Sequence, residues 1–303
     1  MSDQPLLEAK GLHKKFPKAK KPALNGVSFN VNRGDIFGLL GHNGAGKSTT
    51  LGIMLGMVYP SAGEVIVDGF SVQKQRADAL RKVGAIFEAP AFFDYMSGWE
   101  NLRFLTSLSG LTSTEGFDEI VDLVSLTERI HTPVGSYSHG MRQRLGVAQA
   151  LIPQPEILLL DEPTDGLDPE GIREFRELVL RLRDERGLTI LLNSHLLSEV
   201  EQVCDRFAIL QAGELIYEGG AEILDPGTVR FAVDVDDWSK GSAIITQSGG
   251  ETELNEPGIF HLSKTADPAD ITAALVGDGL RVRSLAPSPR SLEDLYLEVT
   301  GKA

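Results

Sequence analysis

The chain has 303 residues, of which 42% are hydrophobic, and a formal net charge of −14. This length allows one large domain with a small one, or two medium ones, and the acidity argues against a general nucleic-acid-binding protein. The single cysteine, Cys204, excludes an intramolecular disulfide and fits a reducing compartment. We expect no signal peptide at residues 1–5, and no apolar run approaches the roughly 20 residues of a membrane helix. Any role at a membrane should therefore go through a partner chain.

The first part of the chain predicts strands, a glycine-rich loop and a helix. Residues 6–12 and 24–40 have the composition of strands, joined by a connection rich in Lys, Pro and Gly. Residues 41–48 read Gly-His-Asn-Gly-Ala-Gly-Lys-Ser, which fits G-x-x-x-x-G-K-[ST] at every fixed position. The amphipathic stretch 49–55 follows, so the pattern lies in the strand–loop–helix context that it requires.

This loop has the chemistry of a phosphate site. Its glycines let the backbone curl so that its N–H groups point at an anion, and the helix that begins near Lys47 adds the positive end of its dipole. Lys47 can reach the β- and γ-phosphates, and the Ser48 hydroxyl can ligate Mg²⁺. A glycine-rich turn without a ligand is the alternative, but the complete pattern favours the phosphate site. The predicted nucleotide-binding residues are Gly41, His42, Asn43, Gly44, Ala45, Gly46, Lys47, Ser48 and Thr49.

The middle of the chain alternates strands with helices, which predicts an α/β core. Residues 157–160 and 189–192 are short apolar runs typical of fully buried parallel strands, with an amphipathic helix at about 170–186 between them. The spacing of apolar residues is helical from about 98 to 150. The remaining expected elements are a strand at 63–69, a short basic helix at 74–82, a buried strand at 83–87 and a closing hairpin at 207–219.

The composition changes at Asp225-Pro226-Gly227, which predicts a domain boundary. We expect a first domain at 1–225 and a small α+β domain at 226–303, for which a ferredoxin-like arrangement is a candidate. The predicted strands of the second domain are 229–234, 243–247, 258–262 and 280–285, and its predicted helices are 268–276 and 291–299.

Three polar residues follow the two central apolar strands. Asp161 comes at the carboxyl end of the first, where a carboxylate can hold Mg²⁺ through water. Glu162 is next to it and can orient and deprotonate the attacking water. His195 comes just past the second strand, and its place at the same sheet edge favours a γ-phosphate contact over a purely structural histidine.

Over residues 6 to about 222, the chain resembles the ATPase subunit of an ATP-binding-cassette (ABC) transporter. The resemblance rests on ordered motifs: the loop 41–48, the signature-like Tyr-Ser-His-Gly-Met-Arg-Gln-Arg-Leu at 137–145, Asp-Glu-Pro-Thr at 161–164, the D-loop Gly-Leu-Asp-Pro at 166–169 and Asn-Ser-His at 193–195. It implies a P-loop NTPase fold of the ABC type with a helical subdomain at about 89–150. It also implies ATP and Mg²⁺ as ligands.

The resemblance implies a site shared by two copies. The signature residues Ser138, His139, Gly140 and Met141 should face the γ-phosphate bound by a second subunit, and the helix that they begin has a dipole suited to an anion. The alternative for Ser138, an ordinary helix N-cap, is compatible with this role. Asp168 belongs to the D-loop. Phe16 stands where the family has an aromatic residue that stacks on adenine, although a core aromatic near a strand end is the alternative.

Two departures distinguish this chain from the usual family pattern. Glu88 stands where a Gln normally contacts Mg²⁺ and water; its carboxylate can still ligate Mg²⁺, but it adds negative charge near the phosphates. His139 and Met141 replace the usual Gly and Gln of the signature. The segments around Glu88 and the signature, and the end of the chain, are similar to ATPases of bacitracin- and lantibiotic-type exporters, which act with a separate permease.

An aromatic-rich patch lies between Glu88 and the signature: Phe92, Phe93, Tyr95, Met96 and Trp99. Core packing of the helical segment is one interpretation, and anchoring of a permease helix is the other.

We expect an ATPase that energises transport, in the direction of export, through a separate membrane permease. The resemblance implies a homodimer that sandwiches ATP at the cytoplasmic face of the membrane, with no nucleic-acid partner. The alternative within the fold is a soluble ABC-type ATPase that acts on the ribosome or on DNA. A kinase or small GTPase is a third alternative, but it leaves the signature unexplained.

Overall fold

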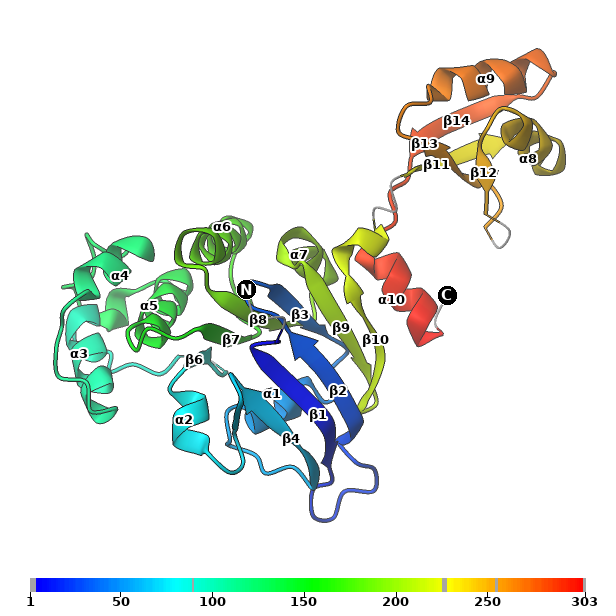
Figure 1. Cartoon of the computed structure of the whole chain (residues 1–303). Coiled ribbons are helices and arrows are strands. Elements are labelled where there is room, and N and C mark those ends of the chain that lie inside the picture. The colour runs from blue at the N-terminus through cyan, green and yellow to red at the C-terminus, as the bar shows by residue number, and fades with distance from the viewer. Residues whose placement is uncertain (1–3, 89, 225–227, 254–255, 302–303) are drawn as a thin grey trace. The chain divides into compact units, whose positions relative to one another are not determined.

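The computed structural model describes residues 4–88, 90–224, 228–253 and 256–301. The chain divides into two compact units, Met1–Gly220 and Ala221–Ala303 (Figure 1). The predicted boundary at Asp225-Pro226-Gly227 lies outside the described residues, as does Ala89 at the start of the predicted helical subdomain. Across the described ranges, no helix combines the length and the apolar character that crossing a membrane requires.

The first unit begins with an antiparallel sheet of strand order β2-β1-β4-β5. Its strands are β1 (Leu7–Lys14), β2 (Leu24–Val31), β4 (Ala62–Val67) and β5 (Phe70–Ser71). The single strand predicted at 24–40 is in fact two strands, because a turn at Asn32–Asp35 interrupts it. In that turn the Asn32 amide donates to the Asp35 carboxylate at 3.1 Å.

The second sheet has six strands in the order β10-β9-β3-β8-β7-β6. All neighbours are parallel except the hairpin of β9 and β10. Its strands are β3 (Ile36–Leu40), β6 (Val83–Ile86), β7 (Ile157–Asp161), β8 (Thr189–Ser194), β9 (Arg206–Gln211) and β10 (Glu214–Gly220). Every residue of β3, β7 and β8 is buried, as the continuous apolar runs predicted. The carboxyl ends of these three strands therefore lie side by side at one edge of the sheet.

Helices cover both faces of this sheet. Phe37 of β3 faces the core between the two sheets, where it stacks on Phe29 at a centroid distance of 5.4 Å. Gly38, the next residue, faces α7, because a Cβ at this position would lie 2.5 Å from Val200 Cγ1. The helices of this α/β core are α1 (Lys47–Met54), α2 (Arg76–Leu80), α6 (Pro169–Arg186) and α7 (Leu197–Val203).

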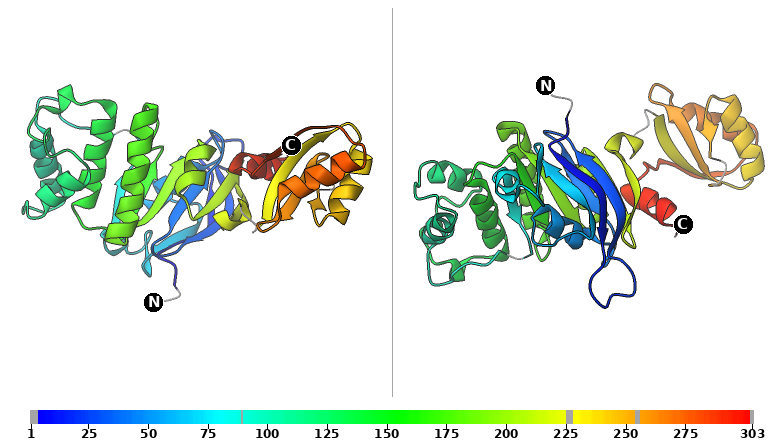
Figure 2. Two further views of the ribbon diagram at one scale, coloured as in Figure 1. Left: turned by 90° about the horizontal axis from the view of Figure 1, so that it is seen from above. Right: turned by 60° about the horizontal axis from the view of Figure 1, so that its bottom comes forward.

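A helical group separates β6 from β7 along the chain. It consists of α3 (Gly98–Leu108), α4 (Phe117–Leu123), the 3-10 turn η1 (Val134–Ser136) and α5 (His139–Leu151). Ser97 begins α3 with a capping box to Glu100. These helices gather beyond the β6 end of the six-stranded sheet in Figure 1, and the two views of Figure 2 agree. The helical spacing in the sequence predicted this group.

The second unit contains the element order β-α-β-β-α-β, which is that of the ferredoxin-like motif. Its sheet is antiparallel, with strand order β12-β13-β11-β14. Phe231 and Phe260 stack in its core at 5.6 Å. Its elements are η2 (Ala221–Leu224), β11 (Thr228–Val235), α8 (Trp238–Gln247), β12 (Glu251–Thr252), β13 (Ile259–Ser263), α9 (Pro268–Gly277), β14 (Val282–Pro287) and α10 (Leu292–Thr300).

One predicted strand of this unit is wrong. Residues 243–247, expected to be extended, form the second half of α8. Asp237 caps this helix by accepting from the Lys240 amide at 3.1 Å, and Gly241, Ile244 and Ile245 are buried at helical spacing. The cap and the spacing outweigh the strand preference of the short run of β-branched residues.

Candidate functional site

The predicted phosphate loop joins β3 to α1 with a backbone that only glycine can adopt at two positions. Gly41 and Gly46 have φ values of 152° and 113°. A Cβ would lie 2.4 Å from Leu210 O at Gly41, and 2.7 Å from Ala23 O at Gly46. The Lys47 ammonium is buried and donates to Gly41 O at 2.7 Å, so the lysine closes the loop on itself. The loop thus has a fixed shape before any ligand arrives.

The residues predicted on β7 and β8 meet beside this loop. Asp161 and Asn193 are paired across the parallel strands, and the Asn193 amide donates a hydrogen bond to the Asp161 carboxylate. Glu162, one residue further, donates its backbone N–H to Asn193 O at 2.8 Å. The carboxyl ends of β7 and β8 are therefore joined by both side-chain and main-chain hydrogen bonds.

The Glu162 side chain connects three of the predicted residues. Its Oε2 accepts from the backbone N–H of His195 at 3.2 Å and lies 2.7 Å from His195 Nδ1. Its Oε1 lies 3.7 Å from the Lys47 ammonium. Glu162 has a φ of 46°, a left-handed conformation that is uncommon outside glycine and that turns the chain sharply at the end of β7. The structure thus brings Lys47, Glu162 and His195 together.

The electrostatic environment of Asp161 is that of a buried carboxylate. The residue is 6% exposed, and burial is the main cause that raises the pKa of Asp161 above its ordinary value. The charges of Glu162 and Glu88 raise it further, whereas the Asn193 hydrogen bond and Lys47 oppose the increase. Glu88 is exposed and has a φ of 58°. The negative charge of Glu88 therefore acts on Asp161.

The oxygen atoms of this site suit Mg²⁺. The Ser48 hydroxyl is exposed at the start of α1, and Asn193 Oδ1 is buried without a hydrogen-bond partner. No cluster of three or more His, Cys, Asp or Glu residues that could hold a metal occurs in the described ranges. Mg²⁺ commonly uses one or two carboxylates together with water and substrate phosphates rather than an all-protein cage. Asp161 and Ser48 fit such a site.

The predicted signature residues are at the start of α5, on the helical group. Ser138 is the N-cap and accepts from the Met141 amide at 3.2 Å. His139 Nε2 lies 2.9 Å from Asp165 O, and a Cβ on Gly140 would lie 3.7 Å from Leu167 Cδ2. In the described part of the chain, no hydrogen bond or ion pair joins residues 138–141 to residues 41–49 of the same copy. Asp168, the predicted D-loop residue, caps α6 by accepting from the Gly171 amide at 2.8 Å.

Phe16 lies in the connection after β1. Its ring is 41% exposed, and the Lys14 ammonium lies 4.9 Å from the ring centroid. The exposure argues against the alternative of a core aromatic. Two other predicted residues, His42 and Asn43, are exposed at the tip of the loop, where His42 Nδ1 lies 2.7 Å from Asn43 O.

The aromatic-rich patch divides between core and surface. Trp99 packs edge-on against Phe117 at 5.6 Å, whereas Tyr95 is 80% exposed and contacts Phe93 at 5.9 Å. Phe93 also meets Phe104 of α3 edge to face at 5.4 Å. A cavity of about 380 Å³ opens beside this cluster, lined by Met96, Glu100, Arg103, Phe104, Ser107, Leu111, Thr112, Ser113 and Phe117.

The sequence did not predict two hydrogen bonds of the site. One is the bond from Asn193 to Asp161, and the other is the bond from Thr164 to Glu199 on α7. A polar residue ending a continuous apolar strand was the available signal for Asn193. No comparable signal marked Glu199, because it lies in a short polar helix.

Comparison with known proteins decides the family. The family model described as ABC transporter matches residues 24–165. The bacitracin transport ATP-binding protein BcrA of Bacillus licheniformis is 36% identical, over 91% of this chain and 91% of its own. A fluoroquinolones export ATP-binding protein of Mycobacterium tuberculosis is 34% identical over 98% and 94%. The chain belongs to the ABC transporter ATP-binding family.

The fold of this ABC ATPase agrees with a solved family member. A dimeric ATP-binding cassette in a post-hydrolysis state, bound to ADP and Pi, has a TM-score of 0.63 and 25% identity, over 71% of this chain and 98% of its own. The predicted ABC-type fold and ATPase activity are confirmed. The alternative of a soluble ABC-type ATPase with a non-membrane partner is not favoured, since the relatives named above are transport and export subunits.

Proposed function

We propose that this ABC ATPase energises export through a separate membrane permease, at the cytoplasmic face of the membrane. The name of the fluoroquinolone relative supports export, and the name of the bacitracin relative supports transport. The separate permease rests on the resemblance of the sequence motifs to exporter ATPases. The exposed cluster of Phe93, Tyr95 and Phe104 supports docking of an apolar permease segment, because large aromatic side chains in pockets are typical interface anchors.

Two copies of the chain bind ATP between them. In each copy residues 41–49 bind the phosphates, and Phe16 stacks on the adenine. Ser138, His139, Gly140 and Met141 of the other copy contact the γ-phosphate, and the D-loop residue Asp168 lies at the interface. The absence of any hydrogen bond or ion pair between residues 138–141 and the phosphate loop within one described copy supports a site completed in trans.

The chemistry of hydrolysis is assigned to Glu162 and His195. Glu162 orients the attacking water and accepts its proton, and His195 contacts the γ-phosphate. Lys47 neutralises charge on the β- and γ-phosphates. Asp161, Ser48 and Glu88 would hold Mg²⁺, which would neutralise negative charge on the phosphates. The observation that carries this assignment is that Lys47 and His195 both approach the Glu162 carboxylate.

The test is Glu162→Gln, which retains the shape of the side chain and removes the base. We expect turnover to fall by at least about 100-fold, with ATP still bound and a stable dimer formed in ATP, measured by phosphate release and light scattering. Glu177→Gln is the matched control, since Glu177 is exposed on α6. Unchanged turnover in Glu162→Gln would remove this residue from the mechanism. Co-purification of the chain with a polytopic membrane protein tests the permease.

A further inference from the structure

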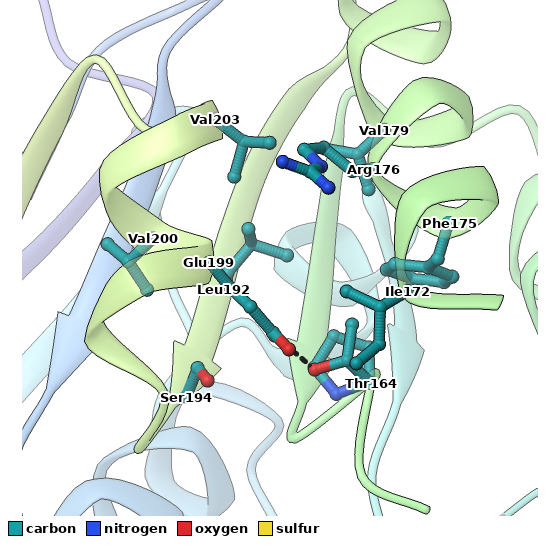
Figure 3. A pocket seen from close by; sticks show the side chains of 11 residues that line it. Thr164, Ile172, Phe175, Arg176, Val179, Leu192, Ser194, Glu199, Val200 and Val203 are labelled. Carbon is teal, nitrogen blue, oxygen red and sulfur yellow. Dashed lines mark hydrogen bonds between the residues drawn. The ribbon is translucent and has the colours of Figure 1, made fainter. Parts of the chain in front are cut away.

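We infer that Glu199 and Thr164 form a positioning pair that sets the geometry between Glu162 and His195. Thr164 Oγ1 donates a hydrogen bond to Glu199 Oε2, and Figure 3 shows this bond at the edge of a small cavity between α6 and α7. Thr164 ends the Asp-Glu-Pro-Thr motif at 161–164, but neither residue is among those assigned above to the phosphates, to Mg²⁺ or to the attacking water. The inference rests on the roles proposed above for Glu162 and His195.

The pair joins the same two segments as the catalytic contact does. Glu162 and Thr164 lie in the turn that follows β7, while His195 and Glu199 lie in the segment that follows β8. The contact of Glu162 with His195 is one connection between these segments, and the bond from Thr164 to Glu199 is a second, two residues further along the turn. Two connections restrict both the distance and the relative orientation of the segments.

Apart from the bond of the Glu162 amide to Asn193 O and the contact of His139 Nε2 with Asp165 O, the other hydrogen bonds of the two described segments are short-range. In the turn, the Asp165 amide donates to Glu162 O at 3.1 Å. After β8, the Leu196 amide donates to Ser194 Oγ at 3.0 Å, and Glu199 donates its amide to Leu196 O at 3.2 Å. Glu199 lies in the first turn of α7, only four residues beyond His195, so its side chain fixes the helix that follows the histidine.

The surroundings make this hydrogen bond hard to replace by water. Thr164 is buried, Glu199 is half-buried, and burial is the main cause that raises the pKa of Glu199. The cavity of about 30 Å³ beside them is lined mostly by apolar side chains: Ile172, Phe175, Val179, Leu192, Val200 and Val203. In the described part of the chain, Glu199 forms no ion pair with a cation. A hydrogen bond in such low-dielectric surroundings is strong, and an unmatched partner is unfavourable.

A structural role and a positioning role predict different results for one double variant. Thr164→Val with Glu199→Leu removes both polar partners and keeps apolar volume, a replacement that can be nearly neutral for stability. If the pair only stabilises the fold, the double variant hydrolyses ATP normally. If the pair positions Glu162 against His195, turnover falls although the protein remains folded.

The experiment measures kcat, KM, ATP affinity and Tm of the full chain for the double variant and for Glu199→Gln. We expect kcat of the double variant to fall by about tenfold, since small misplacements of catalytic groups have effects of this order or larger. Its ATP affinity and Tm should stay near those of the unchanged protein. Glu199→Gln, whose amide oxygen can still accept from Thr164, should retain most of the turnover.

Two results would overturn the positioning pair: a double variant with unchanged kcat, or a parallel loss of kcat, ATP affinity and Tm. Glu162→Gln, assayed alongside, separates this inference from the proposed function. If Glu162→Gln is inactive while the double variant is fully active, only the positioning pair fails. If Glu162→Gln is itself active, the assignment of the hydrolytic residues fails first. Glu177→Gln on α6 controls for a change of charge alone.

Discussion

Nδ1 of His195 lies 2.7 Å from Oε2 of Glu162, and the backbone N–H of His195 points to the same oxygen. A carboxylate only accepts hydrogen bonds, so Nδ1 carries the proton in this arrangement. Nε2 then has a proton to donate to a phosphate only when the ring is positively charged or changes tautomer. Under the proposed mechanism, His195 therefore donates from Nε2 to the γ-phosphate either as a positively charged ring or after it releases Glu162.

The shape of the phosphate loop depends on Gly46. Gly46→Ala would place a Cβ 2.7 Å from both Ala23 O and Leu24 Cδ2 at a positive φ. Such strain is on the order of 1–3 kcal/mol, so we expect ATP affinity to fall by at least about tenfold, measured by calorimetric titration. Gly69→Ala is the control, because Gly69 has a φ of 82° and no atom within 4 Å of its Cβ position. Equal losses in both variants would show that positive φ alone is responsible.

Glu88 adds a charge that the family pattern lacks. Its charge raises the pKa of Asp161, so we expect it also to repel phosphates bound at the proposed site. We expect Glu88→Gln to bind ATP about threefold more tightly in EDTA, an effect that should shrink in high salt. Fluorescent-nucleotide titration with and without Mg²⁺ measures it. A selective loss of affinity for the Mg²⁺ complex would instead identify Glu88 as a direct ligand.

Ser138 is exposed at the start of α5, where a large cation would obstruct closure against a second copy. Ser138→Arg should reduce turnover by at least about tenfold, because it displaces donors from the transition-state charge. ATP binding to the monomer should persist, since the phosphate loop is on another element. Ser138→Ala separates the loss of the cap, about 1 kcal/mol, from the added bulk. If Ser138→Arg loses ATP binding and dimer formation equally, misfolding is the explanation.

Four charged residues form a closed set of ion pairs at the amino ends of the central strands. Arg33 and Lys82 each contact both Asp68 and Glu156, with 2.5 Å from Arg33 to Glu156 and 2.6 Å from Lys82 to Glu156. The hydrogen bond from Lys82 is the largest cause that lowers the pKa of Glu156. The same lysine lowers the pKa of Asp68, whereas Asp68 and Glu156 raise the pKa of Lys82.

These shifts give a pH dependence with a definite sign. Because the folded-state pKa of Glu156 is below its ordinary 4.5, its contribution is present above about pH 4.5 and is lost as the pH falls through the folded value. Glu156→Gln should lower the free energy of unfolding by about 1 kcal/mol at pH 7, the usual upper range for exposed pairs. The difference from the unchanged protein should disappear in strong acid and shrink in high salt.

Denaturant unfolding monitored by tryptophan fluorescence measures this difference. The chain has two tryptophans, and Trp99 lies in the first unit while Trp238 lies in the second. In a Trp238→Phe background, Trp99 therefore reports on the unit that carries the ion pairs. Glu177→Gln is the control for an exposed carboxylate. If the difference in unfolding free energy between Glu156→Gln and the unchanged protein did not change with pH, the ion pairs would be excluded as its cause.

The sequence predicted those parts of the site whose chemistry is local. The loop around Lys47 is a run of consecutive residues, so a single sequence pattern identifies it. The positions of Asp161 and His195 follow from two apolar strands that end at one edge of the sheet. The contact of Glu162 with His195 required only that these strands be neighbours, which they are.

The sequence could not predict contacts that depend on how loops and helices pack. The bond from Thr164 to Glu199 joins the turn after β7 to the start of α7. The packing of α6 and α7 sets the relative position of these segments, and no pattern of neighbouring residues in the sequence predicts it. The prediction of a strand at 243–247 was wrong for a related reason. The β-branched residues of this segment favour a strand, but burial against the sheet of the second unit selects the helix. The boundary between the predicted domains 1–225 and 226–303 stays a prediction.

The helical group is a single excursion of the chain between two strands that are direct parallel neighbours, paired Val83 to Ile157. Because the two strands are parallel, the chain leaves at the carboxyl end of β6 and returns at the amino end of β7, so the helical group is part of the crossover connection that this pair requires. The exposed aromatic residues Phe93, Tyr95 and Phe104 lie within this crossover, whereas Asp161, Glu162 and His195 lie at the ends of β7 and β8. We therefore expect substitutions of these aromatic residues to alter docking to the proposed permease while the residues proposed for hydrolysis keep their positions.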